Sequence, residues 1–285
     1  MTYELIDQRP LGAGSGIDIE QHCDRLHAML APARRWLVIT GAGVSAASGI
    51  PTYRDDDGTL LRSDPIQHQD FILSAHTRRR YWARSMVGWP LVADARPNLT
   101  HRALSRLEGM GRISLLVTQN VDRLHQHAGQ RRVIDLHGRL DRIRCLDCGR
   151  IGERSELQQR LQALNPAFSA HIAEARPDGD ADVDEAQLAH FAVPACHACG
   201  GVLMPDVVFF GGSVRRSRVA NINNCIEQAL AVYVVCSFMT VFSGFRFCRL
   251  ARQLDKQLVV VNRGATRADD LATLKIPLDC AAVLQ

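Results

Sequence analysis

The sequence predicts an α/β protein: a Rossmann-like parallel sheet with an inserted, smaller zinc-binding module. Three observations lead to this expectation. A strand-like apolar run is followed by a glycine turn and a helix start; similar runs alternate with helical stretches further along; and a segment with four spaced cysteines and few apolar runs interrupts the alternation. We expect residues 18–139 and 202–285 to form the Rossmann-like domain and residues 140–201 the module.

The elements follow from their apolar patterns. Residues 18–34 have helical spacing, and Trp36–Thr40 is a short apolar run rich in β-formers that ends at a glycine turn. A helix can begin at Ser45–Ser48, and two further helices are expected at His101–Leu107 and Phe245–Leu254. A loop is expected near residues 174–185. The remaining buried-strand candidates share short apolar runs: Ile113–Thr118, Val133–Leu136, Val207–Phe210, Ala231–Cys236 and Leu258–Asn262.

Composition excludes several classes of protein. No apolar run reaches the roughly 18 residues of a membrane span, and Met1 to Pro10 lacks the pattern of a secretory signal, so we expect a cytoplasmic protein. The net charge is only +4, and 30 acidic residues are spread among 34 basic ones. This mixture disfavours nucleic-acid binding and favours a solvated face for the arginine clusters. The oligomeric state is not set by any pattern in the chain.

Four of the nine cysteines are spaced as metal ligands. Cys145 and Cys148 form one CxxC knuckle and Cys196 and Cys199 another, each followed by a glycine that relieves a tight turn. Two such knuckles complete a tetrahedral zinc site, and four protein ligands leave no open position, so this zinc should be structural. The rival interpretation, a redox CxxC, is disfavoured by the pairing. An odd cysteine total does not suggest a disulfide framework, and we expect the other five to be small buried residues.

The glycine turn Gly41-Ala42-Gly43 places bare backbone amides directly after a strand, which suits a diphosphate. Alone this is a weak signal, but it opens the run GAGVSAASGIPTYR over residues 41–54. Further along come TQNVD at 118–122 with Leu124-His125, LHG at 136–138, PDVVFFG at 205–211, SGFRF at 243–247 and NRG at 262–264. Together with the knuckles, these ordered motifs resemble the sirtuin family of NAD-dependent protein-lysine deacylases, in its class II form, over roughly residues 20–284.

The resemblance implies an activity and its partners. Acyl groups would be removed from lysine side chains of proteins or peptides with consumption of NAD, giving nicotinamide, O-acyl-ADP-ribose and free lysine. The catalytic residues would be His137, as general base on a ribose hydroxyl, and Asn120. An imidazole whose ordinary pKa is near 6.5 suits this work. His125 is the other candidate for the base, but it is structural in the family pattern. The alternative for His137 itself is a buried histidine whose ring nitrogens are hydrogen-bonded and take no part in catalysis.

The resemblance also implies ligand contacts. The substrate peptide would add to the strand edge at Val207, Phe209, Phe210 and Gly211, although an ordinary buried strand is the alternative there. The NAD contacts would come from the turns named above and from late segments of the chain: Gly41, Ala42, Gly43, Ser45, Gly49, Ile50, Pro51, Tyr53, Arg54, Gln119, Asn120, Val121, Asp122, Cys236, Ser237, Phe238, Asn262, Arg263, Gly264 and Cys280.

Two departures from the family pattern matter. Cys236-Ser237-Phe238-Met239 stands where the family has GSSL or GTSL, and Gly212 stands where it has the glutamate of FFGE. A cysteine at a turn that meets the ribose should weaken NAD binding. An NAD-sensing scaffold with weakened catalysis is therefore kept as an alternative. Mono-ADP-ribosyl transfer to protein is another, because it uses the same cofactor and the same bond cleavage. A zinc-based DNA-binding module is a remote fourth possibility.

Overall fold

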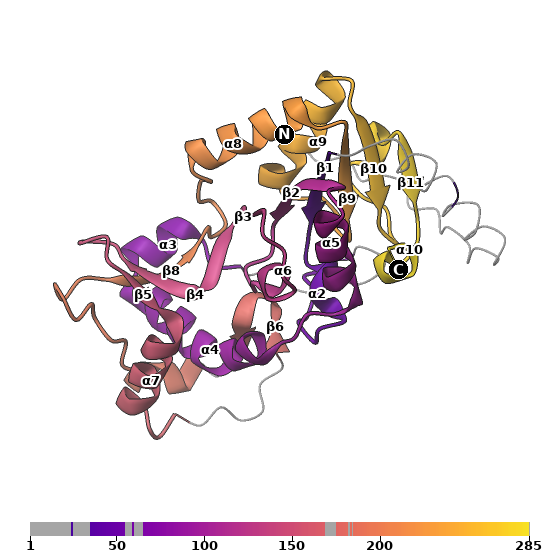
Figure 1. Ribbon diagram of the computed structural model, residues 1–285. Coiled ribbons are helices and arrows are strands. Elements are labelled where there is room, and N and C mark those ends of the chain that lie inside the picture. Colours follow the sequence, from indigo (N-terminus) through magenta and orange to yellow (C-terminus); the bar gives the residue numbers. More distant parts are fainter. Residues whose placement is uncertain are drawn as a thin grey trace. The chain divides into compact units, whose positions relative to one another are not determined.

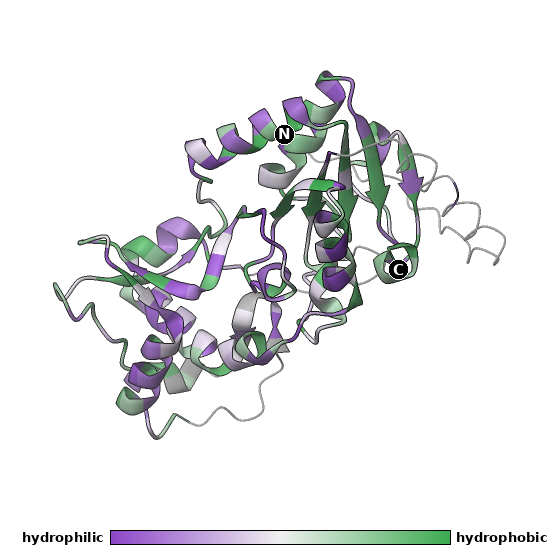
Figure 2. Cartoon of the chain, viewed as in Figure 1, coloured by the Kyte–Doolittle hydropathy of each residue, from purple (hydrophilic) through white to green (hydrophobic). Residues whose placement is uncertain are grey.

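The computed structural model describes residues 24, 35–54, 59, 65–168, 175–181, 183 and 185–284. Its larger sheet has six strands in the order β11-β10-β9-β1-β2-β3, and every neighbouring pair is parallel (Figure 1). The strands span β1 Trp36–Thr40, β2 Ile113–Thr118, β3 Val133–Asp135, β9 Ala231–Val235, β10 Gln257–Val261 and β11 Leu274–Ile276. The predicted Rossmann-like sheet is confirmed. Most residues of its central strands are coloured as hydrophobic in Figure 2.

Strand order places a switch point between β1 and β9. From β1 the chain proceeds to β2 and β3 on one side, whereas β9, β10 and β11 build outward on the other. In an open parallel sheet, ligands bind at the carboxyl ends of the strands where the order reverses. The turns that follow β1, β2 and β9 therefore border the expected ligand crevice.

Helices cover both faces of this sheet. On one face α8 (Arg216–Gln228) and α9 (Phe242–Gln253) bury apolar side chains against alternate residues of four strands: Leu37, Ile39, Leu115, Val117, Val232, Val234, Leu258 and Val260. On the other, α5 (Leu99–Gly109) packs on β2 and on α6 (Leu124–His127). The two helices expected at 101–107 and 245–254 are confirmed as α5 and α9. Short elements complete this part: α2 Gly43–Ala46, η3 Asp269–Leu271 and α10 Cys280–Val283.

A second, smaller sheet is antiparallel, with the order β5-β4-β8. Its strands are β4 Gly138–Cys145, β5 Ile151–Glu153 and β8 Leu203–Val207. Its core also receives Phe71 of α3 (His68–Leu73) and Trp82 of α4 (Ala75–Asp94), besides Leu157 of α7 (Arg154–Leu164). The sheet of the module therefore runs from residue 138 to 207, and helices encoded before β2 help to cover it. The division into 18–139, 140–201 and 202–285 itself stays a prediction.

Two sequence expectations are wrong. The strand expected at Val207–Phe210 is instead β8, which ends at Val207 and pairs antiparallel with β4 rather than joining the parallel sheet. The loop expected near 174–185 contains a two-stranded hairpin, since β6 (Ala175–Arg176) pairs with β7 (Asp180–Ala181) around the short helix η1 (Pro177–Gly179). Helix η2 (Glu185–His190) follows.

The hairpin is held by α4: Arg84 forms an ion pair with Asp180, and a side chain at Gly88 would overlap the backbone of Asp180. The helix expected over residues 18–34 lies outside the described residues except for Asp24. No helix among the residues described is long and apolar enough to cross a membrane.

Candidate functional site

The turns after β1 and β2 are joined by a chain of polar contacts. The Asn120 amide donates to the hydroxyl of Ser45 over 3.0 Å, and Ser45 donates to the carboxylate of Asp122 over 2.6 Å. Burial raises the pKa of Asp122, although the hydrogen bonds from Ser45 and the Leu124 amide lower it. Three residues predicted to contact NAD therefore lie together. They line a cleft with other predicted contacts and with two apolar neighbours: Ala42, Ile50, Pro51, Val121, Val92 and Leu140.

The glycine turn packs against the turn after β9. A Cβ at Gly41 would lie 2.6 Å from the Ser237 hydroxyl, and one at Gly43 would lie 3.0 Å from the Cys236 carbonyl oxygen. The Gln119 amide reaches across the same boundary and donates to Ser237 over 2.9 Å. The sheet therefore brings all three turns of the switch point into contact, as their placement at parallel strand ends requires.

His137 follows β3 and precedes β4. The backbone there turns through Gly138, whose φ is 88°, and a Cβ on Gly138 would overlap the carbonyl oxygen of Asp206. Only glycine fits this approach, so Gly138 fixes the direction in which the His137 side chain leaves the chain. The Leu136-His137-Gly138 motif is thus a backbone requirement as well as a sequence signature.

The ring of His137 is held at both nitrogens. Its Nδ1 lies 3.0 Å from the carbonyl oxygen of Gln119, and its Nε2 lies 2.7 Å from the hydroxyl of Ser243. Burial lowers the pKa of His137 to about 4, the hydrogen bond to Gln119 raises it, and the charge of Arg218 lowers it. The imidazole is therefore neutral at neutral pH, the state that can accept a proton.

Among the described residues, His101 and His125 are also buried, and they contact each other rather than the crevice turns named above. His125 lies 2.9 Å from the Thr40 hydroxyl, and its ring packs 4.8 Å from that of His101. Burial lowers the pKa of His101 to about 4, and burial followed by the charge of His101 lowers that of His125. His101 lies on α5 and His125 on α6, so the ring contact joins these two helices, and the Thr40 hydroxyl connects His125 to the end of β1.

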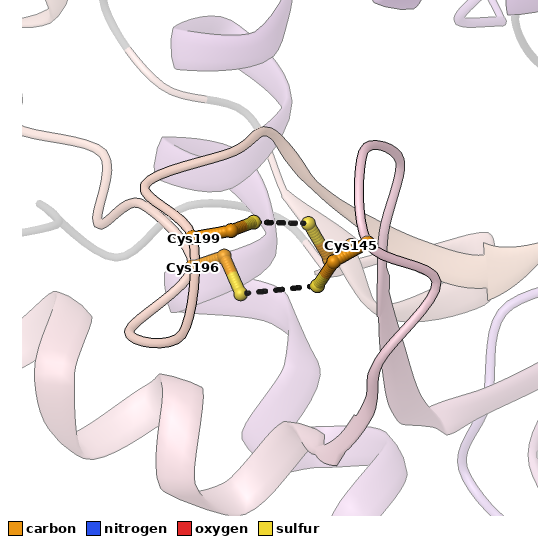
Figure 3. Close-up of side chains that lie close together, drawn as sticks. Cys145, Cys196 and Cys199 are labelled. Atoms are coloured by element: carbon orange, nitrogen blue, oxygen red, sulfur yellow. Dashed lines mark hydrogen bonds between the residues drawn. The ribbon is translucent and has the colours of Figure 1, made fainter.

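The four knuckle cysteines meet at one point. All four sulfurs lie within 4.8 Å of one another; Cys145 is 3.5 Å from Cys199, and Cys148 is 3.9 Å from Cys196 (Figure 3). A tetrahedron with Zn–S bonds of about 2.3 Å has sulfur–sulfur edges of about 3.8 Å. The cluster therefore fits zinc without rearrangement, and four thiolates would close its coordination shell. The neighbouring His197 is exposed and lies outside the cluster.

The two knuckles have the same local build. The amide of Gly149 donates to the carbonyl of Cys145 over 3.1 Å, and that of Gly200 donates to Cys196 over 2.8 Å. Both glycines have positive φ, 71° and 74°, a conformation that L residues rarely adopt. The glycines noted after each CxxC thus close equivalent turns.

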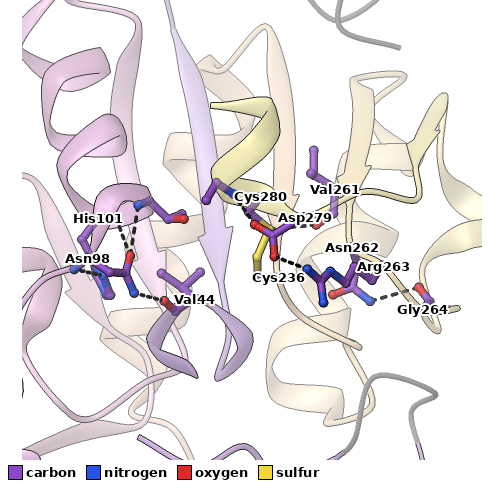
Figure 4. The surroundings of a disulfide bond; sticks show 12 residues. Val44, Asn98, His101, Cys236, Val261, Asn262, Arg263, Gly264, Asp279 and Cys280 are labelled. Carbon is purple, nitrogen blue, oxygen red and sulfur yellow. Dashed lines mark hydrogen bonds and ion pairs between the residues drawn. A yellow bond between two sulfur atoms is a disulfide. The ribbon is translucent and has the colours of Figure 1, made fainter. Parts of the chain in front are cut away.

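Cys236 and Cys280 form a disulfide, with Cα atoms 6.4 Å apart and 44 residues of separation (Figure 4). The expectation that these two are merely small buried residues is wrong. Their spacing gave no signal, because the turn after β9 meets α10 only in the folded sheet. Cys236 also has a φ of 49°, so it occupies a backbone conformation that favours glycine.

The late segments predicted to contact NAD gather around this disulfide. The Asn262 amide donates to the Gly264 carbonyl over 3.0 Å, and Arg263 pairs with Asp279 over 3.1 Å. Asp279 directly precedes Cys280 and caps α10. Phe238 lies on the same turn as Cys236, where it is partly exposed. These residues therefore share one border of the crevice, beside the carboxyl end of β10.

The segment after β8 lies beside His137. The Val208 amide donates to the His137 carbonyl over 2.7 Å, and the Phe210 carbonyl accepts from His68 over 2.8 Å. Phe209 packs inward against Phe71, whereas Phe210 is 40% exposed. Tyr53, on the loop that includes Arg54, has its ring 6.3 Å from that of Phe210.

The local backbone explains why residue 212 is a glycine. Its amide donates to the Phe209 carbonyl over 2.9 Å, and a Cβ at residue 212 would lie only 2.9 Å from that oxygen. The tight turn over residues 209–212 therefore leaves no room for the glutamate that the family pattern carries there. This departure is explained by a local backbone requirement and leaves His137 untouched.

Comparison with known proteins agrees with this geometry. The model of the Sir2 family matches residues 41–243. "NAD-dependent protein deacetylase 2" of Bradyrhizobium diazoefficiens is 52% identical to this chain, over 91% of this chain and 95% of the relative. "NAD-dependent protein lipoamidase sirtuin-4, mitochondrial" of Bos taurus is 46% identical, over 91% of this chain and 83% of the relative.

Solved structures give the same result. "Sir2-p53 peptide-NAD+" has a TM-score of 0.72 and 26% identity, over 91% of this chain and 94% of that one. "Sir2 bound to acetylated peptide" has a TM-score of 0.72 and 26% identity, over 92% and 94%.

Proposed function

Since the chain belongs to the Sir2 family, we propose that it removes acyl groups from protein lysine side chains with consumption of NAD, and that His137 is its general base. The observation that carries the proposal is the state of the His137 ring. A carbonyl oxygen only accepts hydrogen bonds, so the contact with Gln119 places the proton on Nδ1. The Nε2 lone pair is then available as the proton acceptor.

NAD fits the crevice at the switch point. The tight turn at Gly41 and Gly43 offers backbone amides to a diphosphate, and Asn120 and Asp122 offer an amide and a carboxylate to hydroxyls and amides of the dinucleotide. When bound, NAD supplies the ribose carbon that carries nicotinamide. Asn120 and Ser45 hold each other in place, and His137 would accept a proton at Nε2 from a ribose hydroxyl. With one water consumed, the products would be nicotinamide, O-acyl-ADP-ribose and free lysine.

The acyl-lysine peptide would lie along Val207, Phe209, Phe210 and Gly211. This segment is anchored to His137 through the Val208 amide, so a substrate backbone aligned with it would be held at a fixed distance from the base. The exposed ring of Phe210 provides an apolar contact at the mouth of the site. Zinc at the four cysteines would hold the module together and take no part in the chemistry, because no ligand position stays open.

A second candidate function, NAD sensing with weak catalysis, is favoured by one observation: the Cys236–Cys280 disulfide at the border of the crevice. A sensor would bind NAD without releasing nicotinamide. Mono-ADP-ribosyl transfer would instead leave ADP-ribose on protein. Both alternatives would use the same crevice, and the products, or their absence, distinguish them from deacylation.

One experiment separates these functions. The protein is incubated with NAD and lysine peptides that carry acetyl, lipoyl or other acyl groups, and the peptides and nucleotides are analysed by mass spectrometry. We expect deacylated peptide and O-acyl-ADP-ribose in equal amounts, and about 10²–10⁴-fold slower formation of both with His137→Ala. Intact peptide without nicotinamide release would favour the sensor, and ADP-ribosylated protein would favour the transferase.

A cytoplasmic location also stays a proposal. It rests on the four free cysteines of the zinc site, which suit a reducing compartment, and it requires the Cys236–Cys280 disulfide to be a reversible cross-link of the kind found in reducing compartments. Fractionation of cells that express the chain would test it, with recovery in the membrane or secreted fraction as the contrary result.

A further inference from the structure

Ser243 opens the SGFRF motif, and its hydroxyl makes the shorter of the two contacts of the His137 ring, 2.7 Å to Nε2. Because Nδ1 carries its proton toward the Gln119 carbonyl, Nε2 must accept, and the Ser243 hydroxyl must donate. The hydroxyl therefore lies on the lone pair that a ribose hydroxyl needs.

The frame around this contact is rigid. Ser243 is the second residue of α9, whose buried Phe247, Cys248 and Ala251 anchor the helix on the sheet. The next residue, Gly244, is packed so closely against Gln119 that a Cβ there would lie 2.7 Å from its side-chain oxygen. Both residues that bind the ring, Gln119 and Ser243, are thus held against each other.

We propose that Ser243 is a positioning residue for the reaction. Its hydroxyl holds the His137 ring with Nε2 directed into the crevice, and it gives up this hydrogen bond to a ribose hydroxyl when NAD binds. The exchange replaces one hydrogen bond by another of similar strength. The inference rests on the proposed role of His137 as general base.

The proposal predicts a change in the pKa of His137 when the Ser243 hydroxyl is removed. A hydrogen bond donated to the Nε2 lone pair favours the neutral ring, as do burial and the nearby charge of Arg218. Arg218 approaches from α8, where it donates to the Leu136 carbonyl over 2.9 Å. Loss of the Ser243 hydroxyl should therefore raise the pKa of His137 while leaving burial and Arg218 in place.

The test compares Ser243→Ala and Ser243→Thr with Ser217→Ala, a matched control. Ser217 is likewise the second residue of a helix, α8, but it is exposed. We expect Ser243→Ala to lower kcat for deacylation by roughly tenfold, less than the loss of about 10²–10⁴-fold expected when the general base itself is removed. The acid limb of its kcat/KM profile should move to higher pH, because a more basic His137 is protonated sooner as pH falls. Ser243→Thr, which keeps the hydroxyl, should restore both.

A readout without turnover completes the test. In protein with ¹⁵N-labelled histidine, NMR should find His137 protonated at Nδ1 in the wild type, with a higher pKa in Ser243→Ala. An Nε2-protonated ring, or kinetics and pKa of Ser243→Ala that match Ser217→Ala, would overturn the proposal. So would equal losses of NAD binding and kcat in Ser243→Ala and Ser243→Thr. Failure of the wild type to deacylate any peptide would instead count against the proposed function, and the NMR result would still decide the role of Ser243.

Discussion

The zinc cluster and the NAD crevice both join residues that are distant in the sequence, but they do so differently. The cluster needs two knuckles, each complete within a few residues and each closed by a glycine of positive φ. The crevice needs turns from several parallel strands, and its parts meet only when the sheet has formed. A locally encoded site should therefore fail as a unit when one ligand is lost, whereas a dispersed site should lose individual contacts.

The largest expected effect tests the first half of this comparison. Cys196→Ser should lose the metal and unfold the module, because structural zinc contributes about 10–16 kcal/mol of apparent binding free energy to folding. Metal content by atomic emission and the thermal midpoint would be measured together. His197→Ala is the matched control, since the residue is adjacent but outside the cluster. A Cys196→Ser protein with unchanged midpoint would refute the structural role of zinc.

The second prediction breaks the crevice at one contact. His137→Ala should keep the fold and most NAD binding, while deacylation falls by about 10²–10⁴-fold. The residue after it, Gly138, sets the backbone, so removal of the ring alone should leave the turn intact. Turnover by peptide mass spectrometry and NAD binding by calorimetry would separate the two effects. Near-normal turnover would remove His137 from the role of base.

The third prediction concerns the buried pair of histidines, His101 and His125, whose rings contact each other. The folded-state pKa of His101 is lowered to about 4, and that of His125 is lowered too, so the unfolded chain binds more protons once pH drops below about 6.5. The stability contributed by the neutral rings is complete above that pH and is lost as pH falls toward 4. A shift of this size corresponds to about 3 kcal/mol for His101.

Urea unfolding between pH 7.5 and 4.5 would measure this loss. His101→Gln is the control, because His101 accepts a hydrogen bond from the Asn98 amide in a capping box, a place that glutamine also fills without titrating. The variant should lose less stability on acidification than the wild type. Equal pH dependence in the two proteins would show that the buried pair is not the cause.

The same comparison explains what the sequence could predict. Trp36–Thr40 and the other central strands were found because strands buried on both faces are continuous apolar runs, and the zinc ligands were found because CxxC spacing is local chemistry. The strand at 207–210 was misplaced because an apolar run does not specify which sheet it joins. The contact of Ser243 with His137 and the bond of Cys236 with Cys280 depend on tertiary placement across 106 and 44 residues, which no local pattern encodes.

The smallest expected effect concerns Cys236, where a dispersed site should tolerate a departure. A non-glycine residue in the left-handed region costs roughly 1–2 kcal/mol, and the Cys236 side chain packs against the glycine turn, 3.1 Å from the position of a Cβ on Gly43. Cys236→Gly should relieve both constraints and bind NAD up to about tenfold more tightly, which corresponds to about 1.4 kcal/mol. It also removes the disulfide, so Cys280→Ser is needed as the matched control, because it removes the cross-link but keeps the side chain at residue 236.

Calorimetric titration of NAD into the three proteins, with and without reductant, separates the effect of the Cys236 side chain from the effect of the cross-link. Tighter binding by Cys236→Gly alone assigns the effect to the side chain and its backbone, and equal tightening in both variants assigns it to the cross-link. Equal or weaker binding by Cys236→Gly would mean that the turn after β9 has adapted to the cysteine, and the prediction would be wrong.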